Sequence, residues 1–453
     1  MPGGRAEPDV AGGERRHGAS AGGSASPAGV VVECELATGI PAIAGHAIGT
    51  RALVLVRVFS EPLGLLSCTL PVGGLPAEDL ARTCVDAFGP QLRTRLEDAG
   101  LSWTGTLPTC GLSPARAPSF LESRQRVLRD GPAITVAVCT RDRPEELARL
   151  LDSLDGQRYE RLRVLVVDNA PSDDRTERVV SAFSRGRDIE YVTERRPGLS
   201  WARNRAISVA DTEIVAWADD DEVCDAWWVA ELARGFVEVP DAQAVTGIVI
   251  PAELETQCQA WFEQYSGVRR GRGFARAVFS PATARDQSPL YPLPPYGAGA
   301  NMAFRREAIE RIGCFDCALG AGTSTLAGED TAALSALLLA GGTIVYQPTA
   351  IVYHRHRRDY PALRRVMVGY GRGLSAYYAS MLVRQPSCAP ELLRLSRRAL
   401  RDQLSRRGER LGDLDDFPRE LLRANRVGLV QGAFLYPGAR RHARHLAGDA
   451  AGR

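Results

Sequence analysis

A regular alternation of strand-like and helix-like segments between residues 134 and 217 constrains the fold of this chain most. Short apolar runs rich in Val and Ile alternate there with amphipathic stretches. The predicted strands are 134–139, 162–167, 189–192 and 213–217, and the helices between them are 144–154, 175–183 and 200–209. Strands and helices that alternate in this way form a mainly parallel sheet with helices on both faces. Because such sheets bind ligands at the carboxyl ends of their strands, residues that follow each strand are candidates for a site.

The segments on either side of this rhythm differ from it. Residues 1–29 are rich in Gly, Ala and Ser without an apolar core, which predicts a disordered tail rather than a signal peptide. Residues 30–130 predict a small accessory α+β module with a strand at 51–59 and a helix at 77–99. The central α/β domain is expected at 132–358, where a helix at 331–340 and strands at 343–346 and 350–353 complete it. Residues 359–453 predict a helical, arginine-rich extension.

Composition excludes several classes of protein. The 453 residues carry 56 basic side chains, all of them arginine, against 54 acidic ones. This near balance gives no indication of nucleic-acid binding, and any phosphate must be held by guanidinium groups, backbone N–H groups or a metal. The ten cysteines are scattered without the paired spacing of a zinc site, as in a reducing cytosol. No apolar run reaches the roughly 18 residues of a membrane-spanning helix, so a cytoplasmic location is expected.

Four consecutive acids, residues 219–222, follow the strand at 213–217. Neighbouring carboxylates repel one another unless a cation or hydrogen-bond donors neutralise them, and Mg²⁺ or Mn²⁺ commonly bridges carboxylates to phosphates. Asp219 and Asp221 are two apart and point the same way in an extended segment, which predicts a metal–diphosphate site. His354, at a strand end, is a candidate further ligand that suits Mn²⁺ better than Mg²⁺. A solvated acidic turn and a structural histidine are the alternatives, and His356 competes with His354 for the role.

A further carboxylate, Asp168, ends the strand at 162–167. It can accept a hydrogen bond from the ring N–H of uracil, thymine or guanine, which neutral cytosine lacks. The sequence therefore favours UDP-, dTDP- or GDP-linked donors over CDP-linked ones. An Asx turn at the strand end is the alternative.

Glu329 and Asp330 lie between a glycine-rich segment and the helix at 331–340. A carboxylate on such a loop can act as general base toward a hydroxyl. Capping of the helix is the alternative interpretation.

Together these motifs resemble the family 2 glycosyltransferases of the GT-A fold over residues 132–385. Each motif alone is weak, but their order and spacing are specific. The segments that carry the resemblance are 138–144 (VCTRDRP), 167–169 (VDN), 197–204 (PGLSWARN), 219–221 (DDD), 299–301 (GAN), 328–330 (GED) and 353–354 (YH).

The resemblance implies a role for individual residues. The nucleotide sugar is expected to contact Thr140, Arg141, Arg143, Asp168, Arg203, Asn204, Asp219, Asp220 and Asn301. Mn²⁺ or Mg²⁺ is expected on Asp221, Asp219 and His354. Asp330, with Glu329 beside it, matches the acid that deprotonates the acceptor in these inverting enzymes.

The expected protein is thus a metal-assisted inverting glycosyltransferase, in which the cation stabilises the departing nucleoside diphosphate and one base suffices. A nucleotidyltransferase of related fold is one alternative, although residues 140–143 do not resemble its glycine-rich loop. A non-catalytic sugar-nucleotide or glycan-binding protein is the other, and the acidic run together with Asp330 argues against it. The segment 427–436 bears two aromatic residues and is flanked by arginines, as in helices that rest on a membrane surface, here the inner face. A buried helix pair is the alternative.

Overall fold

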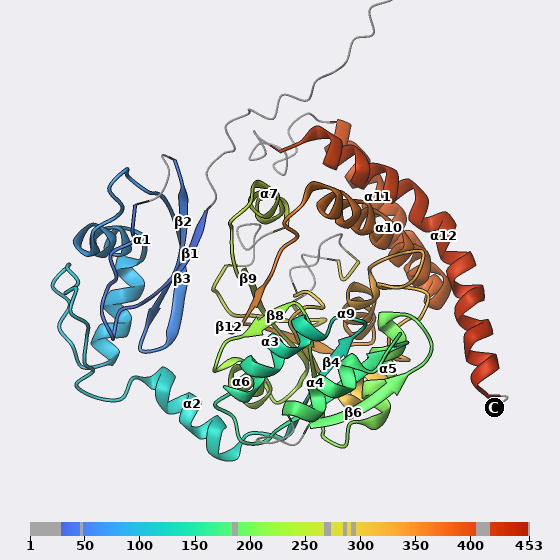
Figure 1. Ribbon diagram of the computed structural model, residues 1–453, viewed down its shortest axis with the longest axis horizontal. Coiled ribbons are helices and arrows are strands. Elements are labelled where there is room, and N and C mark those ends of the chain that lie inside the picture. Colours follow the sequence, from blue (N-terminus) through green and yellow to red (C-terminus); the bar gives the residue numbers. More distant parts are fainter. Residues whose placement is uncertain are drawn as a thin grey trace, which may run out of the picture.

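The computed structural model describes residues 29–45, 49–183, 189–266, 273–283, 288–290, 296–404 and 417–451. Along the chain it runs from a small N-terminal sheet through a large central sheet to a group of C-terminal helices (Figure 1). The tail predicted for residues 1–29 falls outside the described residues except for Gly29, whose backbone N–H donates to the carbonyl of Leu254 at 2.6 Å.

The N-terminal module is a three-stranded sheet with helices. The first strand runs parallel to the second, and the second antiparallel to the third. The long helix buries Leu80, Cys84, Leu92 and Leu96, because these residues recur at helical spacing on one side. The sequence predicted the second strand and this helix, but not the other elements. The elements are β1 (Val30–Glu35), β2 (Arg51–Val58), β3 (Glu61–Thr69), α1 (Ala77–Asp98) and α2 (Ser119–Asp130).

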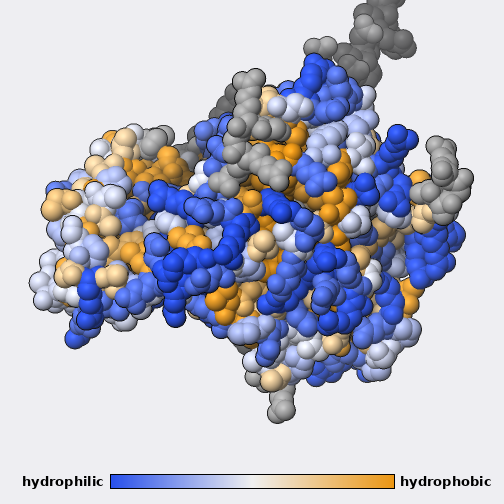
Figure 2. Space-filling model, turned by 90° about the horizontal axis from the view of Figure 1, so that it is seen from below, coloured by the Kyte–Doolittle hydropathy of each residue, from blue (hydrophilic) through white to orange (hydrophobic). Residues whose placement is uncertain are grey.

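The module packs directly against the central sheet. Leu55 of β2 joins a buried cluster with Ile250 and Ile351 of the large sheet. Nearby, buried Arg57 donates to Asp225 at 2.6 Å and to the hydroxyl of Tyr353 at 3.0 Å. In a view from below, the module is the lobe on the left (Figure 2). Since Tyr353 directly precedes His354, the module supports the strand end that carries one of the predicted metal ligands.

The central domain is a mixed, mainly parallel sheet with the strand order β10-β12-β9-β11-β7-β4-β5-β6, and β8 pairs with β12. Its strands are β4 (Ile134–Thr140), β5 (Leu162–Asn169), β6 (Ile189–Glu194), β7 (Ile214–Asp219), β8 (Glu222–Cys224), β9 (Ala242–Pro251), β10 (Ala277–Phe279), β11 (Met302–Arg305) and β12 (Thr343–His354). Its helices are α3 (Pro144–Asp155), α4 (Arg175–Phe183), α5 (Leu199–Val209), α6 (Trp228–Glu238), α7 (Gln257–Ser266), α8 (Arg306–Arg311) and α9 (Glu329–Leu339).

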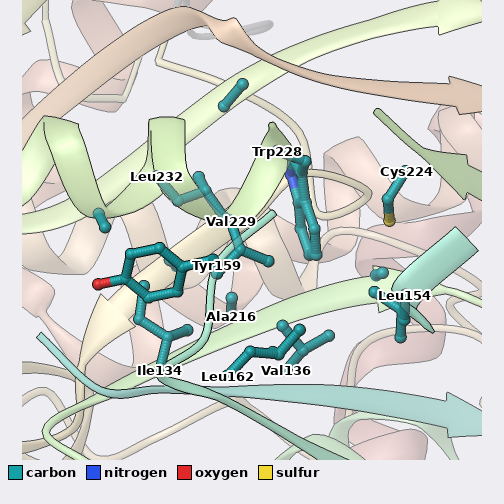
Figure 3. Packing of buried hydrophobic residues seen from close by; sticks show 14 of the residues in the cluster. Ile134, Val136, Leu154, Tyr159, Leu162, Ala216, Cys224, Trp228, Val229 and Leu232 are labelled. Carbon is teal, nitrogen blue, oxygen red and sulfur yellow. The ribbon is translucent and has the colours of Figure 1, made fainter. Parts of the chain in front are cut away.

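Helices cover both faces of this sheet, as the alternating pattern predicts. In β4, Val136 and Val138 face one core with α3, α4 and α6, while Ala137 faces the other with α5, α8 and α9. Figure 3 shows the first core, in which the Trp228 ring lies among residues of the strands and helices. The side chains on both faces of a strand are therefore apolar, because neither face of the sheet meets water.

Register brings the ends of the parallel strands to one edge. Cys139 of β4 pairs with Asp219 of β7, and Thr140 pairs with Asp168 of β5. At the far side, β12 is one strand with an irregularity between Tyr346 and Ile351, where the sequence predicted two short strands. Pairing with β9 on both sides of the irregularity keeps β12 continuous. The candidate residues at the ends of β4, β5, β7 and β12 therefore lie in one region.

The C-terminal part consists of α10 (Tyr360–Arg384), a 3₁₀ turn (Pro386–Cys388), α11 (Ala389–Leu404) and α12 (Arg419–Ala451). Helices α10 and α12 pack with their backbones in close approach. A Cβ on Gly428 would lie 2.2 Å from the carbonyl of Val368, and one on Gly432 would lie 2.0 Å from that of Arg372. The inner side of α12 is therefore buried, as in the helix-pair alternative. Among the helices in the described ranges, none combines the length and apolar character needed to span a bilayer.

Candidate active site

The four acids at 219–222 run from the last residue of β7 to the first of β8, and their side chains have different surroundings. Asp219 lies with one oxygen 3.4 Å from Arg203 Nη2, and about a third of its side chain, 36%, is exposed. Glu222 is buried and folds back so that its Oε2 accepts from the backbone N–H of Asp219 at 2.9 Å. Burial raises the pKa of Glu222 well above its ordinary value. A neutral Glu222 relieves part of the repulsion in the run and fixes the backbone at Asp219.

Asp220 points into the protein. It accepts a hydrogen bond from Thr140 Oγ1 at 2.8 Å and is paired with Arg143. Burial raises the pKa of Asp220 to about 7. These two contacts join the segment from Thr140, at the end of β4, to Arg143, just before α3, to the acidic turn. They fix the position of Asp220 relative to this segment.

Asp221 faces one imidazole and two guanidinium groups. Its Oδ1 lies 3.3 Å from His354 Nε2, and its Oδ2 lies 3.3 Å from Arg143 Nη2 and 3.1 Å from Arg357 Nη2. Burial alone would raise the pKa of Asp221, but the imidazole and the two guanidinium groups hold it well below its usual value. Asp221 is therefore ionised at neutral pH, as a cation ligand must be.

The donor set fits a hard dication that also binds phosphate. Within the described ranges, no three His, Cys, Asp or Glu side chains form a group that could hold a metal ion on their own. Mg²⁺ and Mn²⁺ sites in phosphate-handling proteins commonly use only one or two protein ligands and complete the shell with phosphate and water. Asp221 and His354 supply one oxygen and one nitrogen that face each other, and two arginines beside them can hold phosphate oxygens.

Asp168 offers a buried, partly unsatisfied carboxylate at the end of β5. Its Oδ2 accepts from the hydroxyl of Tyr191 at 2.8 Å, whereas its Oδ1 makes no hydrogen bond among the described residues. Burial raises the pKa of Asp168. A buried acceptor without a partner costs free energy, and a donor on a bound ligand would recover it.

Asp330 lies in the first turn of α9, next to the other elements of the site. Its Oδ2 accepts from the backbone N–H of Gly299 at 2.7 Å, and its Oδ1 from that of Thr331 at 2.6 Å. Gly328 precedes the helix with a φ of +98°, a conformation that favours glycine. These contacts fix the carboxylate at the start of the helix.

Glu329 points the other way, into the protein. Its Oε1 accepts from Arg203 Nη1 at 2.8 Å, and only 8% of the side chain is exposed. Burial raises the pKa of Glu329 to about 7, against the opposing effect of Arg203. The same guanidinium also donates to the carbonyl of Gly299 at 3.3 Å and contacts Asp219, so Arg203 joins the acidic turn to α9.

Three residues expected at the nucleotide have other surroundings. Asn204 bonds the backbone of Phe315 through both its amide nitrogen and its oxygen, each at 2.9 Å. Asn301 is fully buried and bonded to Ile248, Ala350 and Trp228. The side chain of Arg141 is about half exposed and 3.7 Å from its neighbour Asp142. The two asparagines bind the loops of the site to the core, because amides can satisfy several backbone groups at once.

Sequence reasoning missed Arg357, Tyr191 and Glu263 as members of this region. Arg357 belongs to the basic run 354–358 directly after β12, a signal that the sequence did contain. Tyr191 lies on β6, one strand beyond Asp168 in the sheet. Glu263 lies on α7, which the sequence did not indicate as part of any site.

The chain matches the family model described as Glycosyl transferase family 2 over residues 135–313. It is 23% identical over 251 residues to the glucosyl-dolichyl phosphate glucuronosyltransferase of Haloferax volcanii. The aligned part covers 53% of this chain and 76% of that protein. It is 28% identical over 232 residues to the pre-mycofactocin glycosyltransferase of Mycobacterium tuberculosis, which covers 49% of this chain and 43% of that relative. The aligned part thus spans less than half of the second protein.

Among solved structures, the chain resembles a mannosyltransferase, PcManGT, from Pyrobaculum calidifontis in complex with GDP-Man and Mn²⁺. The identity is 18% and the TM-score 0.42, over 73% of this chain and 81% of that one. The family match covers the strands that carry Thr140, Asp168 and Asp219 and ends shortly before α9. Residues 135–313 of this protein thus form a glycosyl transferase family 2 domain, which makes the protein a glycosyltransferase.

Proposed function

We propose that this glycosyltransferase, which takes its sugar from a nucleotide sugar, is a metal-assisted inverting enzyme with Asp330 as its base. The contact set of Arg203 carries the proposal. One buried guanidinium contacts Asp219 of the acidic turn at 3.4 Å and Glu329 of α9 at 2.8 Å. Arg203 therefore holds the acidic turn, where the metal and the diphosphate are expected, next to the start of α9, where the base is expected. A single displacement requires the leaving group and the base to be close in this way.

The residues divide the chemistry between them. Asp221 and His354 would hold Mn²⁺ or Mg²⁺, with Asp219 beside them, and the bound cation would stabilise charge on the leaving diphosphate. Arg143 and Arg357 are placed to bind phosphate oxygens. The acceptor oxygen attacks C1 of the sugar while its proton passes to the Asp330 carboxylate. The bond from C1 to the phosphate oxygen breaks, and its electron pair leaves with the nucleoside diphosphate.

Release of a nucleoside diphosphate tests this reaction class. Purified protein, Mn²⁺ and a panel of sugar nucleotides are incubated, and the released nucleotide is identified by chromatography. We expect a nucleoside diphosphate, formed by slow transfer to water even without the natural acceptor. Formation of pyrophosphate from a sugar phosphate and a nucleoside triphosphate would instead support a nucleotidyltransferase.

Asp168 predicts which bases the donor carries. Its free Oδ1 can accept the ring N–H of uracil, thymine or guanine. A hydrogen bond to a charged acceptor contributes about 1.5–3 kcal/mol, so UDP or GDP should bind about tenfold or more tightly than CDP. Competition binding measures this preference. Asp168→Asn should reduce it, whereas Asp174→Asn, at an exposed carboxylate paired with Arg178, should not. A wild-type preference for CDP would contradict the contact.

We also propose that the outer side of α12 rests on an anionic membrane surface. Val427, Val430 and Phe434 recur at i, i+3 and i+7 and are 52%, 68% and 82% exposed. The helix runs along the outside of the molecule (Figure 1). Exposed arginines lie on both sides of this stripe, and apolar residues flanked by arginines match an anionic lipid surface. They are Arg423, Arg426, Arg441 and Arg444.

Vesicle co-sedimentation tests the membrane contact. The wild type should bind vesicles containing phosphatidylglycerol, bind pure phosphatidylcholine weakly and lose binding at high salt. Phe434→Glu should weaken binding about tenfold or more, because it removes an exposed aromatic side chain that the membrane would bury. Val72→Glu, at an apolar residue that is 71% exposed elsewhere, is the matched control. A dimer that Phe434→Glu dissociates, with no vesicle binding, would contradict the proposal.

A further inference from the structure

A chain of side-chain contacts leads away from the proposed metal site to α7. His354 Nε2 lies 3.3 Å from Asp221 Oδ1, and His354 Nδ1 lies 2.9 Å from His356 Nδ1. His356 Nε2 in turn lies 3.2 Å from Glu263 Oε2. A carboxylate from α7 thus reaches the predicted metal ligand through two imidazole rings in series.

The partners fix where the ring protons lie. Two imidazole nitrogens 2.9 Å apart share one hydrogen, so one ring donates and the other accepts. The Glu263 carboxylate accepts only, which puts a hydrogen on His356 Nε2 and leaves His356 Nδ1 as the acceptor. His354 therefore donates from Nδ1, and Nε2, the ring nitrogen that faces Asp221, is the one that a cation can bind.

His354 Nε2 lies 3.3 Å from a carboxylate oxygen of Asp221, so a cation between the two atoms would have one nitrogen and one oxygen ligand. With both rings neutral, moving the hydrogen to His354 Nε2 would turn the chain of hydrogen bonds round and leave the lone pair of His356 Nε2 against Glu263. The His356 ring is the more deeply buried of the two, with 3% of its side chain exposed against 20% for His354.

Packing against α7 holds this chain of side-chain contacts in place. The ring of Phe262 lies 4.4 Å from that of His356 between centroids. From the same helix, Gln259 Nε2 donates to the backbone carbonyl of His356 at 3.3 Å. Helix α7 therefore determines both the position of the His356 ring and the direction of its hydrogen bonds.

We propose that Glu263 and His356 are positioning residues that hold His354 with Nε2 free for a divalent cation and so set the cation affinity of the site. The inference rests on the proposed metal-assisted function and deepens it. Partners that bind the second ring nitrogen of a ligating histidine orient it and raise its basicity, and their loss weakens metal binding roughly 10–100-fold.

Direct Mn²⁺ binding tests the role, measured from the electron paramagnetic resonance signal of free Mn²⁺ without nucleotide. Glu263→Gln should raise the Mn²⁺ dissociation constant about tenfold or more, which means weaker binding. The control is Glu255→Gln, because Glu255 is an exposed carboxylate nearby that pairs with Arg358. It should leave the constant unchanged. His356→Gln should act like Glu263→Gln and gives a second reading if the first variant loses thermal stability.

A double-mutant cycle separates positioning from general damage. In a His354→Ala background, Glu263→Gln should have no further effect on Mn²⁺ binding, because the residue acts only through His354. An equal loss in both backgrounds, or an unchanged constant in the single variant, would overturn the inference. Failure of the wild type to bind Mn²⁺ at all would instead contradict the proposed metal site itself.

Discussion

Replacing Asp330 with Asn should lower turnover by a factor on the order of 10²–10⁴ while donor binding is retained. Asn has nearly the same shape but cannot take a proton. Its oxygen can keep one of the two backbone hydrogen bonds that Asp330 accepts from Gly299 and Thr331. Losing the other should cost about 1 kcal/mol of stability, which leaves the protein folded. Steady-state kinetics, donor titration and thermal unfolding measure the three effects separately.

Asp359 provides a matched control for the capping alternative. Its side chain accepts from the backbone N–H of Ala362 at 2.8 Å at the start of α10, so it is a helix cap on an exposed loop. Asn caps helices as well as Asp does, and Asp359→Asn should leave turnover unchanged. If Asp330→Asn behaves in the same way and stays fully active, Asp330 is not the base.

Replacing Asp221 with Ala should abolish transfer and the Mn²⁺-dependent part of nucleotide binding. Among the residues that the structure describes, this carboxylate is the group that His354, Arg143 and Arg357 share. Without it a cation loses its oxygen ligand, while the two arginines remain to bind phosphate. We therefore expect weak nucleotide binding that no longer responds to Mn²⁺, measured by calorimetric titration with Mn²⁺ and with EDTA.

Asp211→Ala controls for the loss of a carboxylate as such, because Asp211 is an exposed partner of Arg163 far from the acidic turn. It should keep both activity and the response to Mn²⁺. An Asp221→Ala protein that transfers sugar at the wild-type rate would remove this residue from the metal site.

The sequence predicted the parallel part of the sheet well because periodicity determines it. The helix at 175–183 has the bounds of α4, and most of the other predicted bounds in the central rhythm differ by one or two residues. Strands β8, β9, β10 and β11 were not predicted. Of these, β8, β10 and β11 are short, and β11 is a strand because Met302–Arg305 is inserted antiparallel between β7 and β9. A run of this length carries no periodic signal of its own.

In the site, too, the sequence predicted some residue positions and not others. Strand ends place Thr140, Asp168 and Asp219 together, and the parallel pairing that the sequence predicts accounts for this. The inward orientation of Asn204 and Asn301 depends on which loop backbones lie within reach, which no local pattern encodes. Glu263 reaches its histidine partner across 93 positions of sequence, so only the packing of α7 against the end of β12 reveals it.

Calorimetric titration of UDP and GDP into the wild-type protein, with Mn²⁺ and again with EDTA, tests the central claim most directly. Asp221 and His354 face each other with a cationic surround that suits a metal-bound diphosphate. We expect UDP or GDP to bind at least tenfold more tightly with Mn²⁺ than with EDTA, as a shared metal–phosphate shell requires. Equal affinity in the two titrations would contradict a metal-assisted site.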